Sequence, residues 1–407
     1  MKSSIIILMK KNVAYILVFV LLFFSGNPLQ DEFGKYTVLV GTGIALILIK
    51  FRIRDKKEFY FYFGRIALSI LVLFICQYLI LGYVSWNGAF NFILKIFFGA
   101  LVVNQLQEHF AAVLFKVVKT LTIISLFAFI IINILHIPVW GYKIGSVQTS
   151  YFFYSVSNGH LMQNAGMFWE PGAFAGILTL TLVLNFQVLD HIWKHDKASI
   201  IILLVGILST QSTTGYITSF IIFVFKFWKF KNKYVAAGVI LFSVFVGKYL
   251  YENTEFLRDK VEHQFEVAKN QDKKEFSDTR FGSIVFDWHY IQKHPVIGNG
   301  FHESTRFSDH IHLQQLTKMG ENLGQGNGFS NFLASMGIPF MISYFALIFI
   351  NFKKIKLDYS IIVVLIILLN LQGEQWLNLP IFLAIPFIRH NDRYKFKRNM
   401  IKNPIVN

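Results

Sequence analysis

The chain has 407 residues, of which 54% are hydrophobic and 15% charged, and its formal net charge is +16. Soluble domains carry about 25% charged residues, so this composition excludes a soluble enzyme, a disordered chain and a secreted disulfide scaffold. The one cysteine, Cys76, excludes an internal disulfide. The sequence therefore predicts a polytopic membrane protein.

Apolar runs near the length of a spanning helix, about 20 residues, recur along the whole chain. In chain order they cover residues 10–25, 36–51, 65–83, 88–104, 117–135, 171–189, 199–210, 214–230, 234–251, 328–350, 359–371 and 376–388. We expect an all-α helix bundle of about twelve spans, with residues 1–407 forming a single transmembrane domain.

The loops between these runs alternate in charge. Lysine and arginine gather in one set, which covers residues 52–57, 194–197, 226–233, 353–356 and 389–402. The alternate set is poor in basic residues and includes 136–170, 209–215 and 372–375. By the positive-inside rule both termini are cytoplasmic and the second set faces outward. The basic excess thus orients the protein, and we expect no nucleic-acid partner.

Two outer loops are longer than the rest. The shorter, 136–170, is rich in aromatic, Asn and Gln residues, and the longer, 252–327, holds 12 of the 23 Asp and Glu. Apolar residues at helical spacing within 257–268 and 281–291 predict two amphipathic helices on the membrane surface or on the bundle. Because loops carry function, we expect the site in the long loop.

Glu170 stands at an expected helix start in the segment Gly166-Met-Phe-Trp-Glu-Pro-Gly172. Pro171 suits the first turn of a helix, and a carboxylate just before it faces the positive helix end. A carboxylate at the mouth of a membrane bundle is a functional candidate. The alternative is that Glu170 only starts the helix, beside the interfacial aromatic Trp169.

Arg280 opens the second amphipathic segment of the long loop, which a His-Pro-x-x-Gly-x-Gly turn closes at 294–300. The planar guanidinium is suited to phosphate oxygens. The alternative is an ion pair with Asp278 or Asp287. Two other outer turns, 327–329 (Asn-Gly-Phe) and 212–215 (Ser-Thr-Thr-Gly), are more typical of helix caps than of catalytic groups.

The order of these motifs resembles the O-antigen polymerase (Wzy-type) and O-antigen ligase superfamily of bacterial membrane glycosyltransferases. The resemblance covers roughly residues 160–340, from the Glu-Pro-Gly span start to the Asn-Gly-Phe entry of a later span. It implies transfer of a glycan from undecaprenyl diphosphate to a sugar hydroxyl at the outer face of the plasma membrane. Polymerases use a lipid-linked repeat unit as acceptor, whereas ligases use lipid A-core.

Two departures from the family pattern bear on the choice between these activities. Gln163-Asn164-Ala165 stands where many relatives carry an arginine, and Gly326 stands where ligases and many polymerases carry a histidine. The missing histidine favours a polymerase and leaves the general base unassigned.

The resemblance maps Arg280 and Glu170 onto family motifs, and we expect both to be catalytic. Arg280, together with Arg306 or Lys318, would neutralise the leaving diphosphate. The first candidate to take the acceptor's proton is Glu170, and the second is Glu303 or Glu321. Further positions expected to bind substrate are Trp169, His294, Gly298, Gly300, Arg306, Glu321 and Asn327. The sequence has no P-loop and no diagnostic metal-ligand spacing, so we expect neither cofactor nor metal.

The interpretation is thus a metal-independent polymerase of O-antigen or capsule repeat units in the bacterial inner membrane. Its substrate is an undecaprenyl-diphosphate-linked oligosaccharide, and a chain-length regulator is its expected protein partner. Two alternatives stay open. One is an O-antigen ligase, and the other is a flippase for lipid-linked sugars, suggested by the many spans and by Lys95 inside 88–104.

Overall fold

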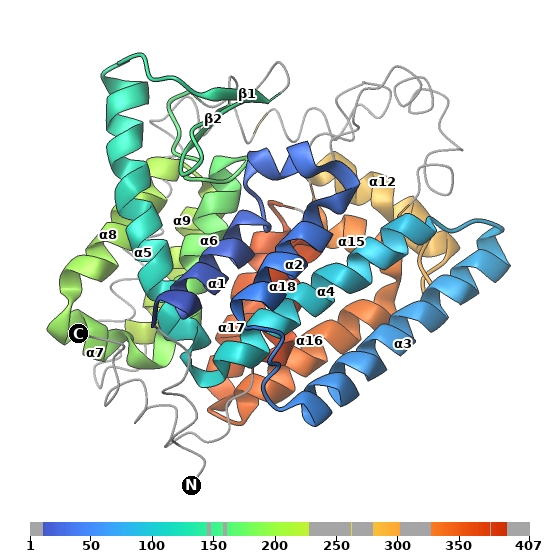
Figure 1. Cartoon of the computed structure of the whole chain (residues 1–407). Coiled ribbons are helices and arrows are strands. Elements are labelled where there is room, and N and C mark those ends of the chain that lie inside the picture. The colour runs from blue at the N-terminus through green and yellow to red at the C-terminus, as the bar shows by residue number, and fades with distance from the viewer. Residues whose placement is uncertain are drawn as a thin grey trace, which may run out of the picture.

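The protein is a bundle of helices with one small β-sheet at its end (Figure 1). The computed structural model describes residues 11–144, 148–157, 161–227, 262, 280–301, 327–374 and 376–388. In these segments helix predominates, which confirms the helical class expected from the composition.

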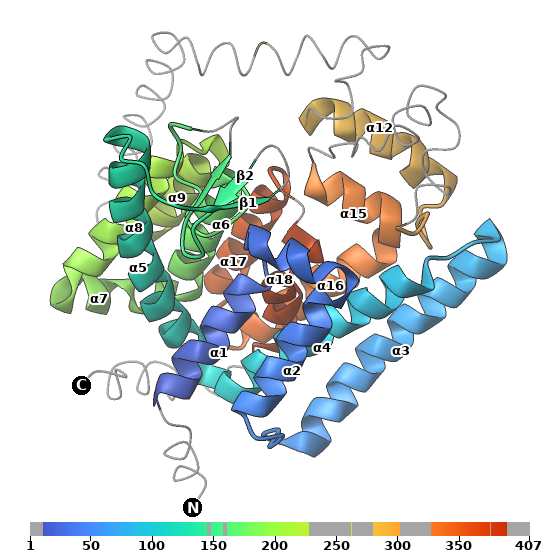
Figure 2. The ribbon, with the colours of Figure 1, turned by 45° about the horizontal axis from the view of Figure 1, so that its top comes forward.

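The first half of the chain forms long apolar helices at the expected places. They are α1 (Lys11–Phe23), α2 (Thr37–Leu48), α3 (Lys56–Leu81), α4 (Trp86–Leu106) and α5 (Phe110–Phe129). The 3₁₀ segment η2 (Pro28–Tyr36) joins α1 to α2, and the π-helical turn η4 (Ile130–Ile134) extends α5. Helix α3 lies along one edge in both views (Figures 1 and 2) and exposes leucines such as Leu68 and Leu79. Such exposure suits a helix that faces lipid.

The second half of the chain surrounds a central helix. Its helices are α6 (Pro171–Leu184), α7 (Leu189–His195), α8 (Lys197–Thr210), α9 (Thr213–Phe227), α12 (Arg280–Lys293), α15 (Gly328–Met336), α16 (Ile338–Lys353), α17 (Leu357–Leu371) and α18 (Pro380–Ala384). Every residue of α6 except Gly172 is buried, and α5, α8, α9 and α17 pack around it. A helix that is apolar all round belongs in the interior of a bundle.

Residues 136–170, the shorter of the two expected outer loops, contain regular secondary structure. They contain a three-stranded antiparallel sheet in the order β1 (Tyr142–Ile144), β2 (Gln148–Ser150) and β3 (Ser155–Ser157). Thr149 of the middle strand pairs with Lys143 on one side and Val156 on the other. These strands add to the all-α fold that the sequence predicts.

The number of membrane spans is only partly established. Within the described segments, Lys56–Leu81 and Trp86–Ile134 are each long and apolar enough to cross a membrane, and two bent helix pairs raise the number to four if each is one span. Shorter apolar helices, α2 among them, lie where other spans are expected. Residues 234–251, the expected ninth span, lie outside the described residues. The total of about twelve spans stays a prediction, and so does the cytoplasmic location of both termini.

Two expected spans differ from the prediction. Residues 328–350 do not form one helix, because the chain bends by 117° between α15 and α16. Residues 376–388 form three short helices, η8 (Trp376–Asn378), α18 and η9 (Ile385–Phe387), instead of one. Pro380 and Pro386 begin two of these, and a proline inside a helix removes a hydrogen bond and clashes with the preceding turn.

The bend between α15 and α16 depends on glycine. Gly337 has a φ of +80°, and a Cβ there would lie 2.2 Å from the carbonyl oxygen of Val296. Gly298 faces it with a φ of +69°, and its Cβ would lie 2.3 Å from the carbonyl oxygen of Ser335. The backbone at Gly298 and the backbone at Gly337 are therefore so close that neither position has room for a side chain.

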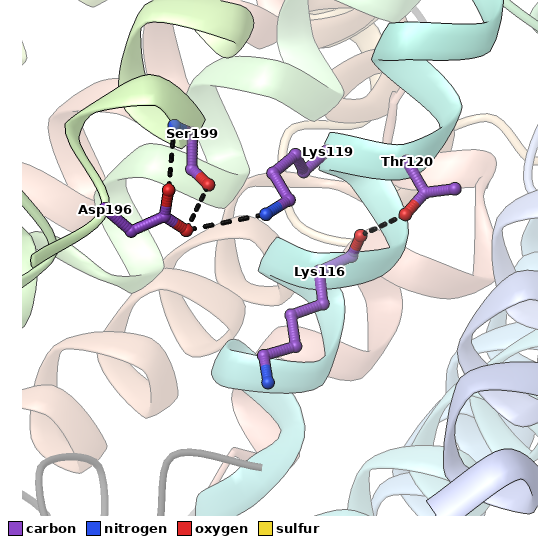
Figure 3. A network of polar contacts seen from close by, with 5 residues as sticks. All are labelled: Lys116, Lys119, Thr120, Asp196 and Ser199. Carbon is purple, nitrogen blue, oxygen red and sulfur yellow. Dashed lines mark hydrogen bonds and ion pairs between the residues drawn. The ribbon is translucent and has the colours of Figure 1, made fainter. Parts of the chain in front are cut away.

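A lysine–aspartate contact lies where α8 begins beside α5 (Figure 3). Asp196 accepts hydrogen bonds from the backbone N–H and the hydroxyl of Ser199 and so caps α8, and Lys119 Nζ of α5 lies 3.4 Å from its Oδ2. Partial burial alone would raise the pKa of Asp196, but the hydrogen bonds and the charge of Lys119 outweigh it and hold the pKa below its ordinary value. This carboxylate thus fixes the start of α8 against α5.

The glycine contact predicts a strong sensitivity to substitution. Gly337→Ala should destabilise the protein by about 1–3 kcal/mol, because alanine at positive φ is strained and its methyl group meets backbone that cannot move away. Thermal unfolding in detergent measures the effect. The matched control is Gly43→Ala in α2, where a Cβ meets nothing within 4 Å. Equal midpoints for the two variants would contradict the role given to Gly337.

Candidate functional site

Four helices begin at one place, next to the turn that follows α17. Arg280, the first residue of α12, donates from Nη1 to Thr214 Oγ1 at the start of α9 (3.3 Å). Asn327, just before α15, donates from Nδ2 to Gln372 Oε1 (2.8 Å). A Cβ added at Gly373 would lie 3.1 Å from Thr214 Oγ1 and 3.4 Å from Arg280 Nη2. The polar residues of these helix starts therefore surround residues 372–374.

Glu374 lies in this turn, and Glu170 and Arg280 are both close enough to act on its charge. Its side chain forms hydrogen bonds with the side chains of Glu170 and Trp169. A Cβ at Gly172 would lie only 2.4 Å from Glu374 Oε1, so the glycine of the Glu-Pro-Gly segment makes room for this carboxyl group. Glu170 precedes α6 in extended conformation, and its side chain does not cap that helix. Glu170 therefore stands at the start of α6 beside a second carboxyl group, and its catalytic role stays a prediction.

The protonation of Glu374 follows from its surroundings. Desolvation raises the pKa of Glu374 well above its ordinary value, and the charge and hydrogen bond of Glu170 raise it further. The charge of Arg280 and the hydrogen bond from Trp169 act in the opposite direction without cancelling the shift. Two adjacent carboxyl groups resist ionising together, so one of them tends to keep a proton.

A buried chain of hydrogen bonds extends from this turn into the bundle. Asn327 Oδ1 accepts from the backbone N–H of Ser330 (3.0 Å), which confirms the helix cap expected at this position. Ser330 Oγ donates to Asp287 Oδ2 (2.6 Å). Both Asp287 and Asn327 are buried. This chain fixes the middle of α12 and the start of α15 to the turn that holds Glu374.

The Gly-x-Gly turn after α12 packs against protein backbone. Gly298 N donates to His294 O (2.9 Å), and Gly300 N donates to Ser335 O (3.0 Å). Gln77 of α3 donates to the carbonyl groups of Ile297 (2.6 Å) and Ser335 (2.9 Å). In the structure the turn joins α3, α12 and α15. The expected role of His294, Gly298 and Gly300 in binding substrate stays a prediction.

Two residues near Glu170 have firm structural partners. Trp169 N donates to Gly26 O (3.1 Å), and a Cβ at Gly26 would collide with the Trp169 ring at 2.2 Å. Asn164 stands in the region where many relatives carry an arginine. It is fully buried, donates to Ser209 Oγ (3.0 Å) and accepts from Gly166 N (2.8 Å). In this chain Asn164 shapes the loop that leads to Glu170.

The structure brings together four of the residues expected from sequence, namely Glu170, Trp169, Arg280 and Asn327. Arg306 and Glu321 lie outside the described residues. Sequence reasoning missed Glu374, although it stands in the turn 372–375 that the charge pattern assigns to the outer side. The rule that marks a carboxylate at a bundle mouth as functional would have selected it.

The described segments contain no group of three or more His, Cys, Asp or Glu side chains placed to hold a metal ion.

Residues 198–345 match a family model described as O-antigen ligase. This match supports the resemblance to the O-antigen ligase and polymerase superfamily that the sequence motifs indicate. The matched segment includes Thr214, Arg280 and Asn327, while Glu170 and Glu374 lie on either side of it. No curated protein matches the sequence.

The hydrogen bonds of Asn327 predict separate effects for two substitutions. Asn327→Ala should cost about 1 kcal/mol or more of unfolding free energy, because α15 loses its cap and Gln372 loses its partner. Asn327→Asp keeps the oxygen that accepts from Ser330 N and should retain most of the stability. Thermal unfolding of both variants in detergent tests this, and an Asp variant as unstable as the Ala variant would argue against a capping role.

Proposed function

We propose that the protein is a repeat-unit polymerase that joins undecaprenyl-diphosphate-linked oligosaccharides at the outer face of the inner membrane. The observation that carries this proposal is the meeting of Arg280 with Glu170 and Glu374 where four helices begin. The products would be O-antigen or capsule chains. The superfamily supports a lipid-linked glycan as substrate and a membrane as the setting.

The surroundings of Arg280 suit a departing diphosphate. Each helix N-terminus carries the equivalent of roughly half a positive charge, and helices α6, α9, α12 and α15 all begin here. Backbone N–H groups at such ends bind phosphate, and the guanidinium adds a planar pair of donors. Because diphosphate leaves readily once its charge is balanced, positioning and charge stabilisation would supply most of the rate.

The acceptor hydroxyl would lose its proton to Glu170. This carboxylate is exposed, so an acceptor sugar can reach it, and it lies next to the Glu374 carboxyl group. Trp169, beside it, offers a flat apolar ring of the kind that stacks on sugars. The other positions expected to bind the glycan, Arg306 and Glu321 among them, remain part of the proposal.

The charges at the two ends of the bundle support an outward-facing site. Helices α6 and α9 begin at the site, and at the far end of α9 Lys226 Nζ lies 2.7 Å from Asp190 and 3.0 Å from the carbonyl oxygen of Phe186. Lys119 beside Asp196 marks the same lysine-bearing end. By the positive-inside rule that end faces the cytoplasm.

The second candidate is an O-antigen ligase, which the description of the matched family favours. Gly326, which replaces the histidine of ligases, favours the polymerase. Purified protein would be given undecaprenyl-diphosphate-linked glycan, with or without lipid A-core. The glycan would be extracted from cells that lack this protein. Extension of the lipid-linked glycan alone supports the polymerase. Transfer only to lipid A-core supports the ligase, and flipping in vesicles without either reaction supports the flippase.

Arg280 provides the test of the reaction itself. Arg280→Ala should lower the rate of glycan extension by about 10²- to 10³-fold, because a preorganised donor to the leaving group is lost. Arg280→Lys should recover part of the rate, since lysine keeps the charge without the fork. The readout is product length against time with the extracted lipid-linked glycan.

The matched control is Arg65→Ala in α3, whose guanidinium lies over the ring of Phe61, 3.8 Å from its centroid. This variant should extend glycan at the wild-type rate. Wild-type activity in Arg280→Ala, at equal amounts of folded protein, would refute the role of Arg280.

A further inference from the structure

The contacts of Glu374 imply a division of labour between the two carboxyl groups. Glu170 is exposed, so water can solvate its charge, whereas Glu374 is partly buried beside Gly172. A hydrogen bond joins the two side chains, and such a bond between carboxyl groups needs one proton. The charged form is disfavoured most at the less solvated group, so the proton belongs on Glu374.

We propose that Glu374 is protonated in the resting enzyme and donates a hydrogen bond to Glu170, which holds Glu170 ionised and oriented toward the acceptor hydroxyl. This inference rests on the proposed function and assigns Glu374 as a positioning residue. Glu374 lies outside the segment that matches the family model, which ends at residue 345.

The transfer step then balances without a proton on the diphosphate. The acceptor oxygen bonds to the anomeric carbon, and the bond from that carbon to the diphosphate oxygen breaks with its electron pair on the diphosphate. The acceptor's proton passes to Glu170 and later to water. Glu374 keeps its own proton throughout, and Arg280 balances the negative charge that collects beside the pair.

Within the described segments, the charged and titratable groups around Glu374 come from the start of α6 and from α12. Glu170 precedes α6, Arg280 begins α12, and Asp287 of α12 connects to the same turn through Ser330, Asn327 and Gln372. Trp169 donates to Glu374 and does not titrate. Of these neighbours, Glu170 is the carboxyl group whose charge and hydrogen bond raise the pKa of Glu374.

The substitution Glu374→Gln separates this proposal from a purely structural role. Glutamine donates a hydrogen bond but cannot ionise, so it imitates the protonated acid. Glu374→Ala should lower the rate of glycan extension by about 100-fold, and Glu374→Gln should recover it to within about fivefold of wild type. The wild-type rate should fall as rising pH removes the proton from Glu374, and Glu374→Gln should lack this alkaline decline.

Stability against pH gives a readout that does not depend on the reaction. A carboxyl group with a raised folded pKa binds its proton more tightly in the folded state than in the unfolded state. Its contribution is therefore fully present below the ordinary glutamate pKa, about 4.3, and is lost as pH rises through the folded pKa. The unfolding midpoint of wild type should fall across this range relative to that of Glu374→Gln.

The control is Glu32→Gln, an exposed carboxyl group of η2 that should match wild type in both measurements. Equal inactivity of Glu374→Gln and Glu374→Ala, or parallel stability curves for wild type and Glu374→Gln, would overturn the proposal. If wild-type protein extends no glycan while the stability curves still diverge, the proposed function fails and the protonation of Glu374 stands.

Discussion

The arrangement of the site depends on the close approach of Gly172 to the carboxyl group of Glu374. Because residue 172 has no side chain, the turn after α17 lies against the start of α6, and Glu170 meets Glu374. Two carboxyl groups in contact need either a shared proton or a nearby cation. The start of α12 supplies the cation, Arg280, and the starts of α9 and α15 add the positive ends of their helices. The glycine contact thus lets the two carboxyl groups meet where Arg280 and these helix starts gather.

The sequence predicts the parts of this site that a local pattern marks. Glu170 precedes a proline and a glycine at a span start, and Arg280 opens an amphipathic segment, so both are visible without a fold. Glu374 becomes a candidate site residue only through its contact with Glu170, which lies about two hundred residues earlier in the chain. The helices were likewise found from apolar runs. The bend at Gly337 was not, because apolar residues continue on both sides of it.

The glycines of the turn 294–300 carry a related lesson. Glycine in a loop indicates close backbone approach, but it does not say to which group. Sequence reasoning assigned that approach to a substrate. In the structure the backbone of Gly298 packs against the backbone of Ser335 and Gly337. Gln77 of α3 donates to one carbonyl group in each of these two segments, those of Ile297 and Ser335. This packing explains the positive φ of Gly298, and substrate binding by the turn stays a prediction.

The position of Arg280 is set by α12 as a whole. Asp287 follows it by seven residues, which places both on one face of the helix. Asp287 is buried and accepts from Ser330, while Phe286 and Tyr290 pack with Ala334 of α15. Helix α15 is in turn fixed at its start by Asn327 and at its end by the bend at Gly337. The guanidinium of Arg280 therefore lies at the start of a helix that buried contacts hold along its length. Under the proposed function, a charge held in this way needs no rearrangement when negative charge develops on a departing diphosphate.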